Sequence, residues 1–221
     1  MPNRDYHQER REYDLKQLAR EELSLDPFVQ FSHWMDEAVT QQIIDPTAMS
    51  VATVDNNHKP HSRVVLLKEV DDSGFVFYTH YDSAKGQQIE NNPHACLLFF
   101  WPQLDQQIRI EGTLEKISRQ QSEAYFHSRP RDSQLAAASS TQSTIVPGRK
   151  TLEMNYSIQE AEYEHIEVPC PDHWGGYRLV PNQFEFWQGR PNRLHDRFTY
   201  TLEKHHPDTN HQAWLIERLA P

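Results

Sequence analysis

Five apolar runs between residues 49 and 117 most constrain what this chain can fold into. They are rich in Val, Ile, Leu and aromatic residues, and they cover residues 49–55, 63–70, 75–81, 95–101 and 107–117. Short segments with Asp, Asn, Gly or Pro separate the runs, which is typical of strands joined by turns. Several runs are almost continuously apolar, so we expect both faces of those strands to be covered. Further strand-like runs, 184–189, 197–204 and 213–219, flank a turn at 205–211.

Helical patterns occur at the N-terminus and in the middle of the chain. The first 45 residues look helical, and Asp26-Pro27 is a start signal for the helix that follows. Its apolar positions recur at helical spacing, at Phe28, Phe31, Met35 and Val39. Ser118 and Gln121 form a capping box for a helix toward residue 140, which Pro130 should kink or split. A further helix is expected over roughly residues 150–165.

These patterns predict an α+β, mainly β fold: a small barrel with flanking helices. We expect an N-terminal helical segment over residues 1–45 and a barrel domain over residues 46–221. No strand–helix alternation of a doubly wound sheet is present.

Composition narrows the classes of function. The net charge of −10 argues against nucleic-acid binding. The sequence contains no run of 18 apolar residues, so we expect no transmembrane helix. The charged N-terminus lacks the apolar region of a secretory signal. With only Cys96 and Cys170, neither a disulfide framework nor a four-thiolate zinc site is possible, so we expect a cytoplasmic protein. We interpret the polar segment with His205, His206 and His211 as a solvated loop, and we expect no metal site.

Seven glycines form neither GxGxxG nor GxxxxGK[ST], so side-chain cations must hold any phosphorylated ligand. One candidate set is Arg63, Lys68, the Tyr78-Thr79 pair and Lys85. Arg63 and Lys68 have opposite parity along a strand, so one of them must lie at a strand end. The set is either a group of solvated strand-end charges or a phosphate clamp.

Two further segments carry candidate groups. Tyr125, Arg129 and Ser133 are spaced i, i+4, i+8, which predicts one helical stripe that either faces solvent or binds a phosphate monoester. An extended segment would place Arg193, His195 and Arg197 on one side. Three cationic or titratable side chains on one face repel one another unless an anion compensates their charge.

At this point the motifs themselves resemble a known family. In chain order they are RVVLLK, FYT, QIENNP, AYFHSRPRDSQ, TQS, HWGGYR, FEFWQG, RLHDRF and ERLAP, with RREY at residues 10–13. Over nearly the whole chain they resemble bacterial pyridoxamine 5′-phosphate oxidases. The resemblance implies a split β-barrel that dimerises and binds FMN in clefts at the subunit interface.

The resemblance also implies roles for individual residues. FMN contacts would be Arg63, Lys68, Tyr78, Thr79, Lys85, Gln107, Gln142, Ser143, Trp187 and Arg197. Substrate contacts would be Lys68, Tyr125, Arg129 and Ser133 at the phosphate, with Arg193 and His195 at the pyridine ring as the catalytic pair. Residues 10–13, including Arg10 and Tyr13, would form a mobile cover over the substrate. Trp187 is compatible with stacking on a heterocycle and equally with a structural role in the core.

The implied reaction oxidises pyridoxamine and pyridoxine 5′-phosphates to pyridoxal 5′-phosphate, with hydride transfer to FMN and reoxidation by O₂ to H₂O₂. Alternatives are an FMN oxidase of another reduced heterocycle, such as a phenazine precursor, or a non-catalytic carrier of FMN or pyridoxal 5′-phosphate. The chain departs from the family at Ala84, where a basic residue is common, and at residues 135–140, where an aromatic residue is expected.

Overall fold

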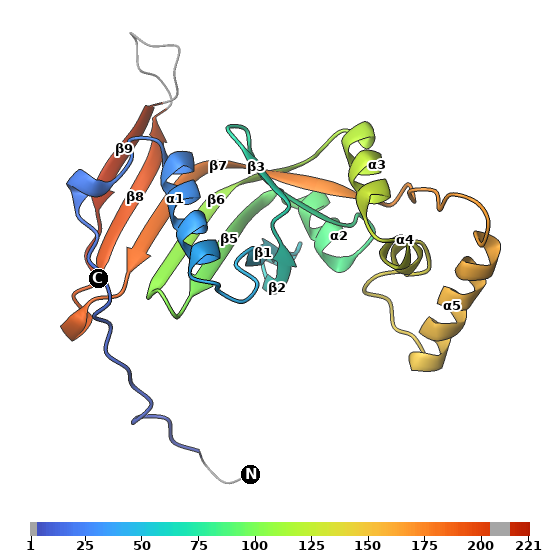
Figure 1. Ribbon diagram of the computed structural model, residues 1–221, viewed down its shortest axis with the longest axis horizontal. Helices are drawn as coiled ribbons and strands as arrows, with labels where there is room; N and C mark the ends of the chain where they lie inside the picture. The colour runs from blue at the N-terminus through green and yellow to red at the C-terminus, as the bar shows by residue number, and fades with distance from the viewer. Residues whose placement is uncertain (1–3, 204–212) are drawn as a thin grey trace. The chain divides into compact units, whose positions relative to one another are not determined.

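The computed structural model describes residues 4–203 and 213–221. The chain divides into two compact units. Unit 1 comprises residues 1–47, 98–110 and 182–221, and unit 2 comprises residues 48–97 and 111–181. Three strands, β5 (His94–Trp101), β6 (Gln106–Lys116) and β7 (Trp174–Gln188), contribute residues to both units (Figure 1). The division into residues 1–45 and 46–221 stays a prediction.

Unit 2 holds most of the short strands and four helices. The strands are β1 (Ala48–Val54), β2 (Pro60–Leu66), β3 (Glu69–Asp71) and β4 (Gly74–His80). The helices are α2 (Ala84–Asn91), α3 (Arg119–Ser128), α4 (Arg131–Ala138) and α5 (Arg149–Glu162). β1 pairs antiparallel with β2, and β4 pairs antiparallel with β3 and with the first half of β7. Phe126, Leu135, Val168 and Trp174 belong to its buried core.

Unit 1 contains α1 (Pro27–Thr40), the 3-10 turns η1 (Arg20–Glu22) and η2 (Pro191–Arg193), and strands β8 (Asp196–Glu203) and β9 (Ala213–Arg218). β8 pairs antiparallel with the second half of β7 and with β9. Aromatic edge contacts fill its core, with Phe28 against Phe184 and Trp34 against Phe186. The hydrogen-bonded order of the sheet is β2-β1-β5-β6-β7-β4-β3, with β8 and β9 following from β7. The α+β, mainly β prediction is confirmed.

Three predicted helix signals are confirmed. The Asp26 carboxylate accepts a hydrogen bond from the Phe28 amide at 2.8 Å at the start of α1. Ser118 and Gln121 cap α3. Pro130 separates α3 from α4, because the residue before a proline is pushed out of the helical region; Arg129 has ψ 152°.

Two expectations were wrong in detail. Residues 4–19 contain no helix, because their charged sequence offers no apolar stripe to bury. The helical spacing from Phe28 to Val39 is confirmed by α1, whose buried face includes Phe31, Trp34 and Ala38. The run 63–70 is split between β2 and β3, and β2 is not covered on both faces. The turn at 205–211 and its three histidines lie outside the described residues.

Candidate functional site

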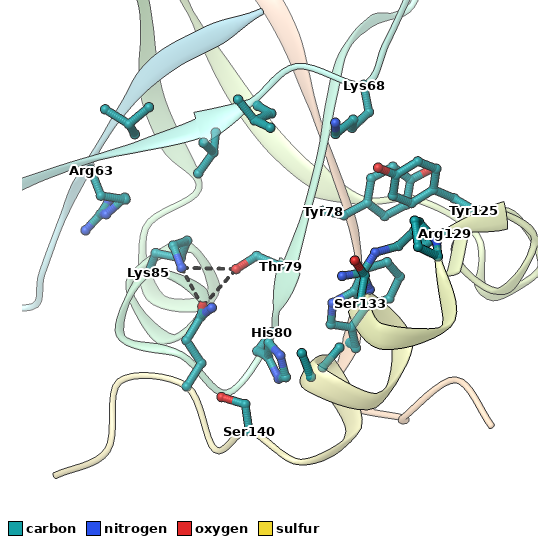
Figure 2. Close-up of a pocket in the computed structure, with 18 residues that line it drawn as sticks. Arg63, Lys68, Tyr78, Thr79, His80, Lys85, Tyr125, Arg129, Ser133 and Ser140 are labelled. Carbon is teal, nitrogen blue, oxygen red and sulfur yellow. Dashed lines mark hydrogen bonds between the residues drawn. The ribbon is translucent and has the colours of Figure 1, made fainter. Parts of the chain in front are cut away.

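Unit 2 contains a pocket of about 640 Å³, which we call the cationic pocket. It is within the range of about 300–1,000 Å³ common for small-molecule sites. Its polar or aromatic lining residues come from β2, β4, α2, α3, α4, the start of β7 and the adjoining loops (Figure 2). They are Arg63, Lys68, Tyr78, Thr79, His80, Lys85, Tyr125, Arg129, Ser133, Ser140, Gln142 and Trp174.

Lys85 is fixed at one end of this pocket by neutral oxygens. Ser83 caps α2 by accepting from the Gly86 amide, so Lys85 stands in the first turn of that helix. Its Nζ donates to Gln142 Oε1 at 2.6 Å and to Thr79 Oγ1 at 3.0 Å, and Thr79 Oγ1 also lies 3.1 Å from Gln142 Oε1 (Figure 2). Together the three side chains form a compact donor cluster with no counter-charge among them.

Arg63 lies in the middle of β2, whereas Lys68 lies beyond the end of β2. The parity argument, which required one of the two at a strand end, is therefore confirmed. The Arg63 guanidinium donates to Thr53 Oγ1 at 2.6 Å, to Gln88 Oε1 at 3.0 Å and to the Val51 carbonyl at 3.1 Å. All three acceptors are neutral, so the charge of Arg63 is positioned but not neutralised.

Tyr125, Arg129 and Ser133 line the same pocket, but not as one helical stripe. The helix ends at Arg129, and Ser133 belongs to the next helix, α4. The Arg129 guanidinium stands 4.9 Å from the Trp174 ring centroid. Within the described part of the chain, its Nη1 atom is buried without a hydrogen-bond partner.

An aromatic stack supports this side of the pocket. The Tyr78 ring lies 3.9 Å from that of Tyr125 and 5.4 Å from that of Trp174, nearly parallel to both. The Tyr78 hydroxyl donates to the Glu69 carboxylate at 2.8 Å. Burial, followed by this acceptor, raises the pKa of Tyr78, so its hydroxyl stays protonated. The stack therefore fixes the orientation of the Tyr125 ring.

The electrostatics of the cationic pocket favour an anion. Burial, followed by the Arg63 charge, lowers the pKa of Lys85 to about 8. Burial also lowers the pKa of Arg63 and of Arg129. Among the described residues, none of the side chains that line the pocket is a carboxylate. The cations therefore lack the compensation that a bound phosphate would supply.

Sequence reasoning missed three polar or aromatic residues of this pocket, His80, Ser140 and Trp174. His80 follows the FYT motif directly and lines the pocket, with its side chain 5 % exposed. Trp174 opens β7 and carries both the aromatic stack and the Arg129 contact. The aromatic character of Trp174 was visible in the sequence, but its proximity to Arg129 depends on pairing residues 45 positions apart.

A second pocket, of about 540 Å³, lies in unit 1, and we call it the N-terminal pocket. Its lining includes four predicted substrate contacts, Arg10, Tyr13, Arg193 and His195. The Tyr13 ring makes edge contacts with the rings of Trp187, at 5.6 Å, and His195, at 5.5 Å. The N-terminal segment thus covers His195, whereas its mobility stays a prediction.

His195 has a defined tautomer in this arrangement. Its Nδ1 atom accepts a hydrogen bond from the Arg190 amide at 3.1 Å, so the neutral ring carries its proton on Nε2. Burial, followed by the charges of Arg193 and Arg197, lowers the pKa of His195. The ring is therefore neutral at neutral pH.

The predicted extended row of Arg193, His195 and Arg197 was wrong. Arg193 lies in the turn η2 with φ 62°, next to Asn192 with φ 57°, and β8 begins only at Asp196. Arg197 donates to the buried Glu185 carboxylate at 2.8 Å, and Arg109 donates to the same carboxylate. Arg197 is thus paired with a carboxylate within the protein, so it gives a weaker argument for an anionic ligand than a cation without such a partner.

Four predicted cofactor contacts lie outside both sets of lining residues: Gln107, Ser143, Trp187 and Arg197. Gln107 lies on β6, and Ser143 adopts φ 72° in the exposed loop after α4. Their roles stay predictions. In residues 4–203 and 213–221, no cluster of three His, Cys, Asp or Glu residues suits a metal ion. No helix in these ranges is long and apolar enough to span a membrane.

Two family profiles match this chain. Residues 35–158 match the family described as pyridoxamine 5′-phosphate oxidase. Residues 174–221 match the pyridoxine 5′-phosphate oxidase C-terminal dimerisation region.

Curated relatives match over almost the full length. The pyridoxine/pyridoxamine 5′-phosphate oxidase 1 of Hydrogenovibrio crunogenus is 59 % identical and covers 100 % of both chains. The corresponding oxidase of Azotobacter vinelandii is 49 % identical and covers 96 % of both. Among solved structures, PhzG from Burkholderia lata in complex with tetrahydrophenazine-1-carboxylic acid is 25 % identical, with a TM-score of 0.85 over 94 % of this chain and 100 % of that one.

A pyridoxamine 5′-phosphate oxidase-related, FMN binding protein from Nostoc punctiforme shares the fold, with a TM-score of 0.68 at 18 % identity over 90 % of this chain and 100 % of that one. The fold is the split β-barrel, as the motifs implied. From the profile over residues 35–158 and the full-length relatives, the chain belongs to the pyridoxamine 5′-phosphate oxidase family.

Proposed function

We propose that this protein oxidises pyridoxamine 5′-phosphate and pyridoxine 5′-phosphate to pyridoxal 5′-phosphate, with FMN as hydride acceptor and O₂ as final oxidant, giving H₂O₂. With the amine, water is also consumed and ammonia is released. The observation that carries the proposal is the cationic pocket. Four cations, Arg63, Lys68, Lys85 and Arg129, line it, and among the described residues no carboxylate does. The relatives named for this reaction, at 59 % and 49 % identity, support the same assignment.

The donors of the pocket form two groups, which supports two phosphate sites. Lys85, Thr79 and Gln142 form one donor cluster near Arg63 (Figure 2). Tyr125, Arg129 and Ser133 form another group of donors, and the buried unpartnered Nη1 of Arg129 in the described structure suits an anionic oxygen. We assign the first set to the FMN phosphate and the second, with Lys68, to the phosphate of the B6 vitamer.

Bound FMN would supply the redox chemistry, since a flavin accepts a hydride and passes electrons to oxygen. The residues of this chain supply position. Binding energy at the remote vitamer phosphate, through Arg129 and Lys68, offsets the entropy lost when the pyridine ring is aligned for reaction. The Tyr78 stack keeps Tyr125 oriented for the same phosphate.

His195 and Arg193 are assigned to the pyridine ring of the vitamer. Because Nδ1 of His195 accepts from the Arg190 amide, the neutral ring holds a proton on Nε2 and can donate it. His195 therefore orients a substrate acceptor, whereas direct proton abstraction by Nε2 would first require loss of that proton. Arg193 adds a permanent positive charge next to it in the N-terminal pocket.

The chain carries the C-terminal dimerisation region of its family, over residues 174–221, which supports a homodimer. We expect it to act in the cytoplasm, because Cys96 and Cys170 are both free.

The test is an aerobic assay with purified protein and FMN. Pyridoxal 5′-phosphate formation is followed from each phosphorylated vitamer, with H₂O₂ measured in parallel and unphosphorylated pyridoxine as the matched control. We expect equimolar aldehyde and peroxide, with a large loss of kcat/KM for the control. FMN binding without aldehyde from either vitamer would overturn the proposal.

The likeness to PhzG favours one alternative, oxidation of a reduced phenazine precursor. Such a substrate needs no phosphate site, whereas this pocket keeps a second set of phosphate donors at Tyr125, Arg129 and Ser133. A dihydrophenazine carboxylate assayed beside the vitamers separates the two reactions. If the protein turned over the phenazine precursor in preference to the vitamers, we would assign it to phenazine oxidation instead.

A further inference from the structure

His80 is a buried polar side chain of the cationic pocket that the proposed reaction leaves without a role. It lies at the end of β4, lines the pocket and is 5 % exposed. Its Nδ1 atom is buried and, among the residues that the structure describes, has no hydrogen-bond partner. An unpaired buried acceptor or donor costs free energy, so a ligand atom that pairs with Nδ1 would be stabilised at this position.

The surroundings of His80 are mostly cationic or titratable. From the loop before β7, His173 stacks on its ring at 5.3 Å. Lys85 from α2 and Arg129 from the end of α3 act on it as positive charges, and Asp82 from the turn after β4 acts in the opposite sense. Burial, followed by His173, Lys85 and Arg129, lowers the pKa of His80 to about 4. Without an anion in the pocket, the ring is neutral at pH 7.

A phosphate dianion would reverse the balance of charge around this ring. An opposite charge within ~4–6 Å raises the pKa of a histidine by ~1–3 pH units, and a phosphate monoester brings nearly two negative charges. A protonated imidazole also forms a stronger hydrogen bond to an anionic oxygen than a neutral one does.

We propose that His80 takes up a proton when a phosphate monoester enters the cationic pocket, and that its Nδ1 then donates a hydrogen bond to that phosphate. The inference rests on the proposed function, because FMN and the B6 vitamer are the two phosphate monoesters concerned. Phosphate binding and proton uptake are then linked, and affinity falls as pH rises through the pKa that His80 has in the complex.

Proton uptake on binding is the direct test. The full chain, freed of flavin, is titrated with FMN at pH 7 by calorimetry in two buffers of different ionisation enthalpy, and riboflavin serves as the phosphate-free control. At pH 7 Lys85 is already mostly charged and the ligand phosphate is mostly dianionic, so both contribute little. If the two negative charges of the phosphate raise the pKa of His80 by the full ~3 pH units, to about 7, the wild type should take up ~0.5 proton more with FMN than with riboflavin.

Two variants assign that proton. H80N keeps a polar group near the position of Nδ1 but cannot titrate, so we expect the uptake to disappear and FMN affinity to fall roughly tenfold at pH 6 and less than about twofold at pH 9. H173F keeps an aromatic ring in the stack and does not alter a residue that lines the pocket. Because His173 lowers the pKa of His80, its removal should leave the proton uptake at least as large as in the wild type. If H80N does not fold, H80Q and the wild-type comparison of FMN with riboflavin remain decisive.

A parallel titration separates the two sources of phosphate. Pyridoxal 5′-phosphate and pyridoxal are titrated into the holoenzyme, whose FMN phosphate is already bound. If only the FMN titration shows proton uptake that H80N abolishes, His80 contacts the cofactor phosphate. If the titration of the holoenzyme with pyridoxal 5′-phosphate shows such uptake, His80 contacts the vitamer phosphate. FMN and pyridoxal 5′-phosphate binding with equal proton uptake in wild type and H80N would overturn the inference and leave the proposed function intact. Failure of the wild type to bind either ligand would overturn both.

Discussion

Two arginines show how the surroundings of a residue decide its chemistry. Arg197 shares the buried carboxylate of Glu185 with Arg109, so its charge is compensated inside the protein. Arg129 has no carboxylate partner among the described residues and rests on the face of Trp174. Burial lowers the pKa of Arg129, which reflects the cost of an uncompensated charge. Of the two, Arg129 is therefore the one poised to bind an anion.

Replacement of Arg129 should weaken vitamer binding specifically. In R129A we expect KM for pyridoxine 5′-phosphate to rise about 10–100-fold, because a hydrogen bond from a charged donor is lost, while bound FMN is retained. Removal of the unpaired charge offsets part of the packing lost against Trp174, so the free energy of unfolding should change by less than about 1 kcal/mol. Steady-state kinetics and the flavin content after dialysis measure both effects.

R131A is the matched control, since Arg131 donates to the Tyr163 and Ile166 carbonyls and does not line the cationic pocket. Its KM should change by less than about twofold. Equal effects of R129A and R131A would remove Arg129 from the phosphate site.

Ala84 is the departure from the family that bears on FMN. It is exposed at the first position of α2, directly before Lys85. A cation there would add to the field at the first donor cluster, so A84R should lower the Kd for FMN by ~1.5–5-fold, as expected for an exposed charge. Fluorescence quenching of FMN gives the Kd, and A84Q controls for side-chain size. An unchanged Kd in A84R would show that the other cations already saturate the site.

At the scale of secondary-structure elements, α2 owes its position to a close approach. A Cβ on Gly86 would overlap the carbonyl oxygen of Tyr81, so only glycine lets α2 lie this close to the end of β4. Lys85 and Thr79 form their hydrogen bond across this contact. The break between α3 and α4 also positions a site residue. Pro130 ends α3 at Ser128, with Arg129 as its C-cap, and Arg129 lines the pocket.

Gly86→Ala should therefore impair cofactor binding as well as stability. Overpacking against backbone costs about 1–3 kcal/mol, and the displaced helix should carry Lys85 away, with a roughly tenfold weaker affinity for FMN. Urea unfolding and FMN titration measure the two effects. Gly148→Ala is the matched control, because nothing lies within 4 Å of its added Cβ and its backbone is extended. Both measurements should remain near wild type there, and a neutral G86A would contradict the role of the close approach.

At the scale of the whole molecule, each pocket is built within one unit of the chain. The cationic pocket is formed by unit 2, and the N-terminal pocket, with His195, by unit 1. The family's dimerisation region, residues 174–221, includes the second half of β7 as well as β8 and β9. The matched region therefore includes the segment that carries His195 and Arg197.

The stability of the flavin-free protein should depend on pH through His80. Its pKa is about 4 in the folded protein and near 6.5 when unfolded, so between these values the unfolded chain binds more protons. Stability is then full above about pH 6.5 and falls as pH drops toward 4, by about 2 kcal/mol at pH 5 from this group. Urea unfolding at pH 7, 6 and 5, at fixed protein concentration, measures the loss. H80N should lose correspondingly less, and identical pH profiles would contradict the assignment.

The sequence by itself determined the local structure and the residue types of the site. Strand runs, the Asp26 and Ser118 caps and the break at Pro130 follow from periodicity and backbone chemistry within a few residues. The motifs also placed nine predicted contacts in the cationic pocket and four in the N-terminal pocket. Only the tertiary structure decided which charges are compensated. Glu185 neutralises Arg197, whereas Arg129, Lys85 and His80 share a pocket without a carboxylate among its described lining residues. That difference depends on strand pairing and burial, because the electrostatic free energy of a charged group is set by desolvation and by neighbouring charges that are distant in sequence.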